Sequence, residues 1–140
     1  MDQWSGYPFA RDRLLKSIAE RAPNRTVVIT GDIHTNWVNE LHSDFSRPGR
    51  PVIGAEFVAT SISSGGDGSA TLPATAVASV AENPHIKWHN RQRGYVMCSV
   101  DADNWNTEYR IVPYVTRPGA PIETPTKWLV TRGKPGIQKV

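Results

Sequence analysis

Hydrophobic positions near the start of the chain repeat with the spacing of an amphipathic helix. Leu14, Leu15 and Ile18 recur at helical intervals, and charged residues occupy the opposite side. Pro8 suits a first helical turn, where its missing N–H costs nothing. The pattern predicts a helix over residues 8–21.

The next segments lack helical spacing and predict strands. Residues 26–30 read TVVIT, which is β-branched at every position without polar alternation. Such a run is typical of a strand buried on both faces, as in a parallel or mixed sheet covered by helices. Residues 56–63, which read EFVATSIS, predict a second strand.

Two further segments fit short helices. A helix starting near Asn36 places Trp37, Val38 and Leu41 on one side. Residues 71–81 are rich in Ala, and we expect a helix to follow their proline.

The second half of the chain predicts an antiparallel pair of strands. Residues 94–100 and 105–112 are strand-like runs separated by a DADN turn, which indicates a hairpin. After Arg117 the tail is rich in proline, and we expect it to cross the surface in extended form. The order of elements indicates one α/β domain over residues 1–140, with a mixed sheet flanked by helices.

Composition supports a globular chain and excludes some classes of protein. The 140 residues are 39% hydrophobic and include five Trp, and the net charge is +3 without a basic cluster that would indicate nucleic-acid binding. The single cysteine, Cys98, forms neither an internal disulfide nor a cysteine-based zinc site. No apolar run reaches the roughly 18 residues of a transmembrane helix, and the first residues do not resemble a signal peptide.

The sequence GDIH directly after the 26–30 strand is the first candidate site. Ligands of open α/β sheets bind at the carboxyl ends of strands, and side chains two apart on extended backbone point to the same side. Asp32 and His34 are therefore candidate ligands of a cation, and Gly31 allows a sharp turn. Spacing alone favours a plainer interpretation, in which Asp32 caps a turn and His34 fills a half-buried niche.

A glycine-rich segment, residues 63–69, is a second candidate. Its backbone N–H groups suit a phosphate, but no Gly-Lys-Ser/Thr follows, so a surface loop is the favoured interpretation. Asp67 is a possible cation ligand within it. The glycine that stands two residues before the nucleophile of serine hydrolases is missing at Ser61 and Ser63, where Ala59 and Ser61 occupy that position, which excludes that class.

Histidines later in the chain form a third candidate. His85, Lys87 and His89 would share one face of a strand, either as ligands or phosphate-binding groups or, as the pattern favours, as an exposed polar face. We expect the alternating Ile86 and Trp88 to face the core.

Five segments, in order, resemble the PhoD-like alkaline phosphatases, a family of metallophosphoesterases. The segments are DQWSGYPFARDRLL, VVITGDIHTNW, EFVATSISSGGDG, NPHIKWHNRQRGYVMC and VTRPGAPIETPTKWLVTRGKPGIQ. The resemblance covers nearly the whole chain, and it implies the C-terminal part of the family's two-sheet sandwich. It also implies hydrolysis of phosphate monoesters and diesters, a site with iron and calcium, and export from the cytoplasm.

By this resemblance, Asp32 and His34 belong to the metal and phosphate site, with His34 as the expected catalytic residue. The resemblance also implies that Trp4, Tyr7 and Asn36 lie at the substrate pocket. Family members are several hundred residues long and carry most metal ligands upstream. Since calcium takes about 6–8 oxygen ligands, the residues of this chain do not complete the site.

We therefore expect the isolated chain to be inactive and to need the missing N-terminal half, which another chain could supply. The alternative is a non-catalytic remnant that binds phosphate or a partner through the glycine-rich loop and the face of His85, Lys87 and His89. As part of an exported enzyme the chain would act outside the cytoplasm, and as a separate chain without a signal it would remain inside.

Overall fold

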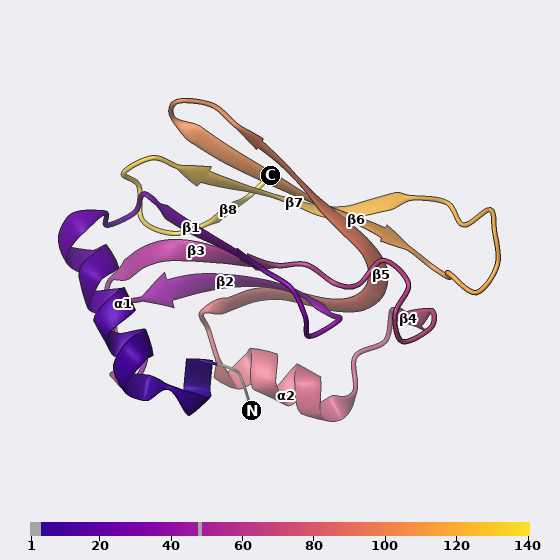
Figure 1. Cartoon of the computed structure of the whole chain (residues 1–140), viewed down its shortest axis with the longest axis horizontal. Coiled ribbons are helices and arrows are strands. Elements are labelled where there is room, and N and C mark those ends of the chain that lie inside the picture. The colour runs from indigo at the N-terminus through magenta and orange to yellow at the C-terminus, as the bar shows by residue number, and fades with distance from the viewer. Residues whose placement is uncertain (1–3, 48) are drawn as a thin grey trace.

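A mixed β-sheet forms most of the computed structural model, which describes residues 4–47 and 49–140 (Figure 1). The helices are η1 (Trp4–Gly6), α1 (Pro8–Arg21) and α2 (Ala74–Glu82), and the strands are β1 (Thr26–Thr30), β2 (Asn36–His42), β3 (Val52–Val58), β4 (Gly68–Ser69), β5 (Ile86–Val100), β6 (Asn104–Val112), β7 (Glu123–Thr131) and β8 (Gln138–Lys139). In the sheet the strands follow the order β1-β3-β2-β5-β6-β7-β8, and β4 pairs with β5 beside this path. β1 and β3 are parallel and the other pairs are antiparallel, which confirms the predicted α/β class with a mixed sheet.

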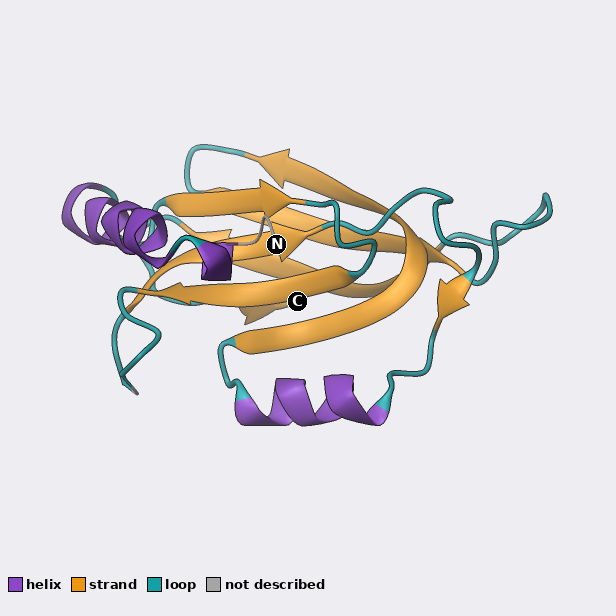
Figure 2. Ribbon diagram, turned by 60° about the horizontal axis from the view of Figure 1, so that its bottom comes forward, coloured by secondary structure: helices purple, strands orange, loops and turns teal. Residues whose placement is uncertain are grey.

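The long strand β5 divides the sheet into two layers. Its residues 86–90 pair with β2, whereas its residues 93–100 pair with β6, and the strand curves strongly between these parts (Figure 2). Gly94 lies after the curve, where an added Cβ would collide with the carbonyl oxygen of Arg110. Glycine therefore allows β5 and β6 to approach each other at this point.

The main core lies between the two layers. It consists of buried side chains from β2, β3, β6 and β7, namely Val38, Ala55, Phe57, Tyr109, Trp128 and Val130. A smaller core forms where Leu15 and Ile18 of α1 pack against Ile53 of β3. α2 has no buried residue and lies along the first part of β5 (Figure 2).

The predicted helix over residues 8–21 is confirmed with the same bounds. Pro8 occupies the first turn, and the helix ends where the amide of Ala22 donates to the carbonyl of Ile18 before a proline. Of the predicted apolar face, Leu15 is buried but Leu14 is 41% exposed. The helix expected after Pro73 is also confirmed, as α2.

The helix expected from Asn36 is wrong, because this segment is the strand β2. β2 pairs with β3 on one side and β5 on the other, so both of its edges are hydrogen-bonded. Val38 is fully buried in the main core while Trp37 stacks on His89 at the neighbouring position. A strand with apolar residues on both faces can show the same spacing of apolar positions as a helix. Here the pairing of β2 with β3 and β5, which are distant in the sequence, makes the segment a strand.

Three strand predictions need smaller corrections. β1 is parallel as expected, but it lies at the end of the strand order and Ile29 is 54% exposed, so it is not buried on both faces in this chain. The strand expected over 56–63 begins and ends earlier, as β3. The hairpin is confirmed, but the tail does not simply cross the surface, because its residues 123–131 form β7 and bury Trp128.

None of the helices in the described part of the chain is both long and apolar enough to cross a membrane.

Candidate functional site

The loop from β1 to β2 carries Asp32 and His34 at the carboxyl end of β1. Both side chains are exposed, and both residues have left-handed backbones, with φ of 70° and 58°. The expectation that extended backbone points them to one side is therefore wrong. A left-handed residue other than glycine costs of the order of 1–3 kcal/mol, and such strain gathers at functional sites.

Arg93 of β5 holds this loop from inside the molecule. Its side chain is buried, and Nη1 donates to the carbonyl oxygen of His34 at 2.6 Å. Its Nε and Nη2 donate to the carbonyl oxygens of Gly66 at 2.9 Å and Gly65 at 3.1 Å. Hydrogen bonds from a charged donor contribute about 1.5–3 kcal/mol each, so these contacts are able to offset the strain of the loop.

Sequence reasoning missed Arg93, because its three shortest hydrogen bonds go to backbone carbonyls 27 to 59 residues away. Every residue has a backbone carbonyl, so an arginine that binds carbonyls has no partner that the sequence identifies by residue type. One signal was present: Arg93 stands directly before Gly94, at the start of the predicted strand over residues 94–100.

Asn36 supports the same loop from its far end. Its side chain is 1% exposed, and its Nδ2 donates to Asn90 Oδ1 at 3.2 Å and to the Gln92 carbonyl at 3.3 Å. Its Oδ1 accepts from the amide of Thr60 at 3.1 Å. The carboxamide that we expected at the substrate pocket is thus occupied by partners within the protein.

His89 is buried beside the first residues of β2 and does not lie on an exposed polar face. Its ring stacks on Trp37 with centroids 3.6 Å apart, and its Nδ1 lies 2.9 Å from the carbonyl oxygen of Asn36. Because a carbonyl only accepts, Nδ1 carries the proton. Burial lowers the pKa of His89, which keeps the ring neutral.

Lys87 and His85 are also engaged with neighbouring residues. The Nζ of Lys87 lies 2.7 Å from a carboxylate oxygen of Glu40 and donates to the carbonyl of Pro84 at 3.1 Å. His85 packs edge-on against Phe45, and burial lowers its pKa. Lys87 is exposed but ion-paired and His89 is buried, so His85, Lys87 and His89 do not share one open polar face.

The glycine-rich loop is fixed by Asp67. Its Oδ1 accepts from the amides of Val115 at 2.7 Å and Thr116 at 2.9 Å, and its Oδ2 accepts from the Thr116 hydroxyl at 3.0 Å. The hydrogen bond from the Val115 amide is the main cause that lowers the pKa of Asp67. The carboxylate joins this loop to the segment after β6, and both lie at the right of Figure 1.

Trp4 and Tyr7 lie beside α1, in η1 and at the residue before the helix. They are 51% and 56% exposed, so their rings are available to a ligand or a partner. No hydrogen bond joins either side chain to Asp32 or His34 among the described residues. Their place at a substrate pocket stays a prediction.

The donor set of this chain fits part of a metal site. Asp32 offers carboxylate oxygens and His34 an imidazole nitrogen, which suit hard and borderline cations. Within residues 4–47 and 49–140, no group of three or more His, Cys, Asp or Glu side chains is placed to hold a metal ion. Two donors are fewer than calcium takes, so Asp32 and His34 alone do not complete a calcium site.

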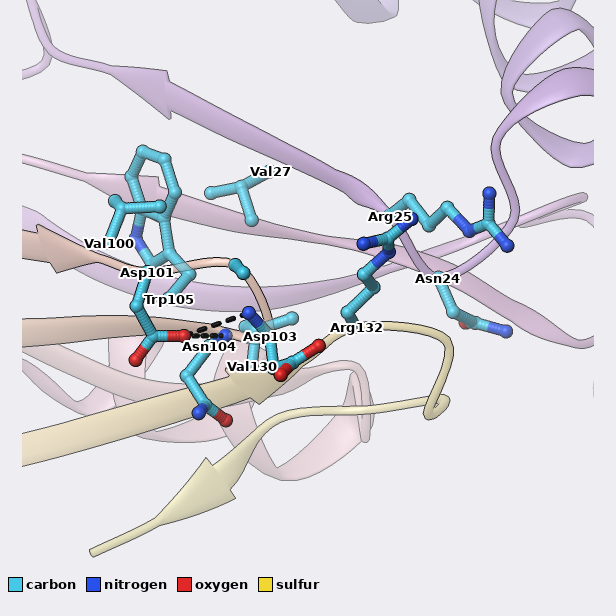
Figure 3. A pocket seen from close by; sticks show the side chains of 11 residues that line it. Asn24, Arg25, Val27, Val100, Asp101, Asp103, Asn104, Trp105, Val130 and Arg132 are labelled. Carbon is cyan, nitrogen blue, oxygen red and sulfur yellow. Dashed lines mark hydrogen bonds between the residues drawn. The ribbon is translucent and has the colours of Figure 1, made fainter.

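A cavity of about 240 Å³ lies at the opposite end of β1, away from Asp32 (Figure 3). Val27, Trp105 and Val130 line it, so it borders the main core. Its charged lining residues are Arg25, Arg132, Asp101 and Asp103. Asp101 accepts from the amides of Asp103 and Asn104, both at 2.8 Å. With two basic and two acidic residues, the cavity has no charge that selects a ligand.

Comparison with known proteins identifies relatives of this chain. Residues 1–109 match the family model described as PhoD-like phosphatase. The chain is 44% identical over 140 residues to alkaline phosphatase D of Bacillus subtilis (strain 168), covering all of this chain and 24% of that protein. A solved structure described as "Structure of PhoD" superposes with a TM-score of 0.92 and 42% identity, over 99% of this chain and 26% of that chain.

The resemblance seen in the five sequence segments is thus confirmed. The chain spans about a quarter of the length of these relatives. It belongs to the PhoD-like phosphatase family.

Proposed function

We propose that this chain contributes Asp32 and His34 to the site of a metal-dependent phosphatase that hydrolyses phosphate monoesters and diesters. The observation that carries this proposal is the left-handed backbone at both residues, held by the buried Arg93. Strain that the surrounding structure maintains is expected where a site needs side chains in fixed places. Membership of the family supports the reaction class, and the conformation of the loop supports the choice of Asp32 and His34.

In the complete site, Asp32 holds a cation through its carboxylate, and His34 either binds a metal or donates a hydrogen bond to a phosphate oxygen. The expected metals, iron and calcium, would activate a water and stabilise the charge that develops on the phosphoryl oxygens. The chain's own part is to present these two side chains on a fixed loop. We further propose that the complete enzyme acts outside the cytoplasm.

The isolated chain is expected to be inactive, since two donors do not complete a two-metal site. The test combines the purified chain with a full-length PhoD-like relative from which the matching segment is deleted, in the presence of iron and calcium. Hydrolysis of p-nitrophenyl phosphate and its bis-ester is the measurement. We expect neither part alone to turn over substrate and the mixture to do so.

Variants then assign the site. Asp32→Asn or His34→Gln should lower the complemented rate by about 100-fold or more, in the range of removing a group that stabilises the transition state. Asp12→Asn, an equal change on the exposed side of α1, should leave the rate unchanged. Robust turnover by the isolated chain would overturn the claim of incompleteness, and full activity of Asp32→Asn and His34→Gln would overturn the site.

A further inference from the structure

Arg93 binds the backbone of two loops, residues 31–35 and 63–69, and is not paired with a carboxylate among the described residues. None of the ion pairs found in the described part of the chain includes this arginine, although its side chain is only 7% exposed. Its shortest hydrogen bonds go to the backbone carbonyls of His34, Gly65 and Gly66, and Nη1 makes longer ones to the Thr60 hydroxyl at 3.4 Å and the Arg91 carbonyl at 3.5 Å. A buried charge without a carboxylate is costly, so these acceptors must compensate for it.

Both loops that Arg93 joins have backbones that need support. In the β1–β2 loop, Asp32 and His34 have left-handed backbones. In the glycine-rich loop, Gly65 and Gly66 have φ of 81° and 71°. The planar guanidinium presents several donors in fixed directions, so it is able to bind both loops at once. A lysine has one compact ammonium group and does not reproduce this fork.

The fit between Arg93 and the glycine-rich loop is tight at one position. A Cβ added to Gly65 would lie 3.0 Å from Nη2 of Arg93, whereas a Cβ added to Gly66 would meet nothing within 4 Å. Asp67 anchors the same loop to Val115 and Thr116. The loop of His34 is therefore tied, through Arg93, to a loop that is itself fixed.

We propose that Arg93 is the positioning residue of the site: its guanidinium clamps the His34 carbonyl to the glycine-rich loop and so holds Asp32 and His34 in their strained conformations. The proposal rests on the proposed function in assigning these two residues to the phosphatase site. Among the described residues, Arg93 makes no hydrogen bond to either of their side chains, and it acts on the loop through the backbone carbonyl of His34.

Backbone order in solution tests the clamp directly. In ¹⁵N relaxation experiments on the 140-residue chain, residues 31–35 and 64–67 should have order parameters near about 0.85, the value of rigid backbone. In Arg93→Lys these residues should fall below about 0.6, while β6 stays rigid. A loss spread evenly over the sheet, or no loss, would overturn the proposal.

A pair of glycine variants tests the same coupling without touching Arg93. Gly65→Ala and Gly66→Ala both place a side chain on a left-handed backbone, but the added methyl meets Arg93 in Gly65→Ala alone. We expect Gly65→Ala to shift the His34 amide and ring resonances and to loosen residues 31–35. Gly66→Ala should leave them in place, and equal effects of the two variants would contradict the clamp.

The complemented enzyme separates this inference from the proposed function. Arg93→Lys should lower its rate about tenfold or more, since small displacements of catalytic groups are expensive. If Asp32→Asn keeps full activity, the proposed function fails while the order parameters still judge the clamp. If residues 31–35 stay rigid in Arg93→Lys, the clamp fails whatever the activity shows.

Discussion

Asp32 and His34 occupy backbone conformations that glycine adopts more easily. A left-handed L-residue costs roughly 1–2 kcal/mol, which is large beside a typical total stability of about 5–15 kcal/mol. If these residues are retained for chemistry, their left-handed backbones lower the free energy of unfolding of the chain. Relieving the strain should therefore stabilise the chain while removing function.

The variant His34→Gly should raise the free energy of unfolding by about 0.5–1 kcal/mol, because relief of strain exceeds the added chain entropy of glycine. Ile33→Gly is the matched control, since Ile33 lies in the same loop without a positive φ. That change should lower the free energy of unfolding by about 0.5–1 kcal/mol. Urea denaturation measures both, and destabilisation by His34→Gly equal to that of Ile33→Gly would refute the strain.

At this scale the sequence predicted two residues of the candidate site. The five segments in order pointed to Asp32 and His34, where spacing alone favoured a capped turn. Arg93 escaped notice because the carbonyls it binds belong to no residue type. Asn36 was expected at the pocket, but its hydrogen bonds to Asn90, Gln92 and Thr60 form only when three distant segments meet.

At the scale of elements, His85 directly before β5 and His89 within β5 make stability depend on pH. The pKa values of His85 and His89 are lowered, chiefly by burial. An unfolded histidine takes up a proton near pH 6.5, so below that pH the unfolded chain binds more protons than the folded chain. Stability should therefore fall as the pH is lowered through about 6.5, and the fall should end at the folded pKa values.

Urea midpoints between about pH 8 and pH 5 measure this effect in the range where histidine titrates. The double variant His85→Gln and His89→Gln should flatten the decline. The carboxylates with lowered pKa, such as Asp44 and Asp67, lose their contribution only at more acidic pH, below their ordinary value of 3.8. A decline of the same size in the double variant would contradict the assignment to these histidines.

The elements that the sequence predicted correctly are those set by local signals. α1 has a proline at its start, a proline after its end and one apolar stripe, and the β5–β6 hairpin has a polar turn between two strand-like runs. β2 was mistaken for a helix because its two faces bury Trp37 and Val38 against different partners. β7 was missed because a proline-rich tail hides the alternation that buries Trp128 and Val130.

For the whole molecule, the longer of the two strands that end the sheet is β1, since β8 at the other end has two residues. β1 pairs with β3 alone and ends the strand order, and Ile29 on it is 54% exposed. The cavity between Val27 and Trp105 opens beside the same strand. Since the chain spans about a quarter of the length of its relatives, this side is where we expect further polypeptide to pack.

A strand edge of this kind favours self-association when it stays uncovered, because its backbone groups pair readily with another strand. The isolated chain should therefore associate as its concentration rises, which sedimentation velocity measures. Ile29→Lys should suppress the association, since a charge on an edge strand opposes pairing. Val77→Lys is the matched control, because Val77 is 53% exposed but lies on α2, which has no strand edge. Equal suppression by both variants would point to general apolar exposure, and a chain that stays monomeric at all concentrations would show that the β1 edge is not adhesive.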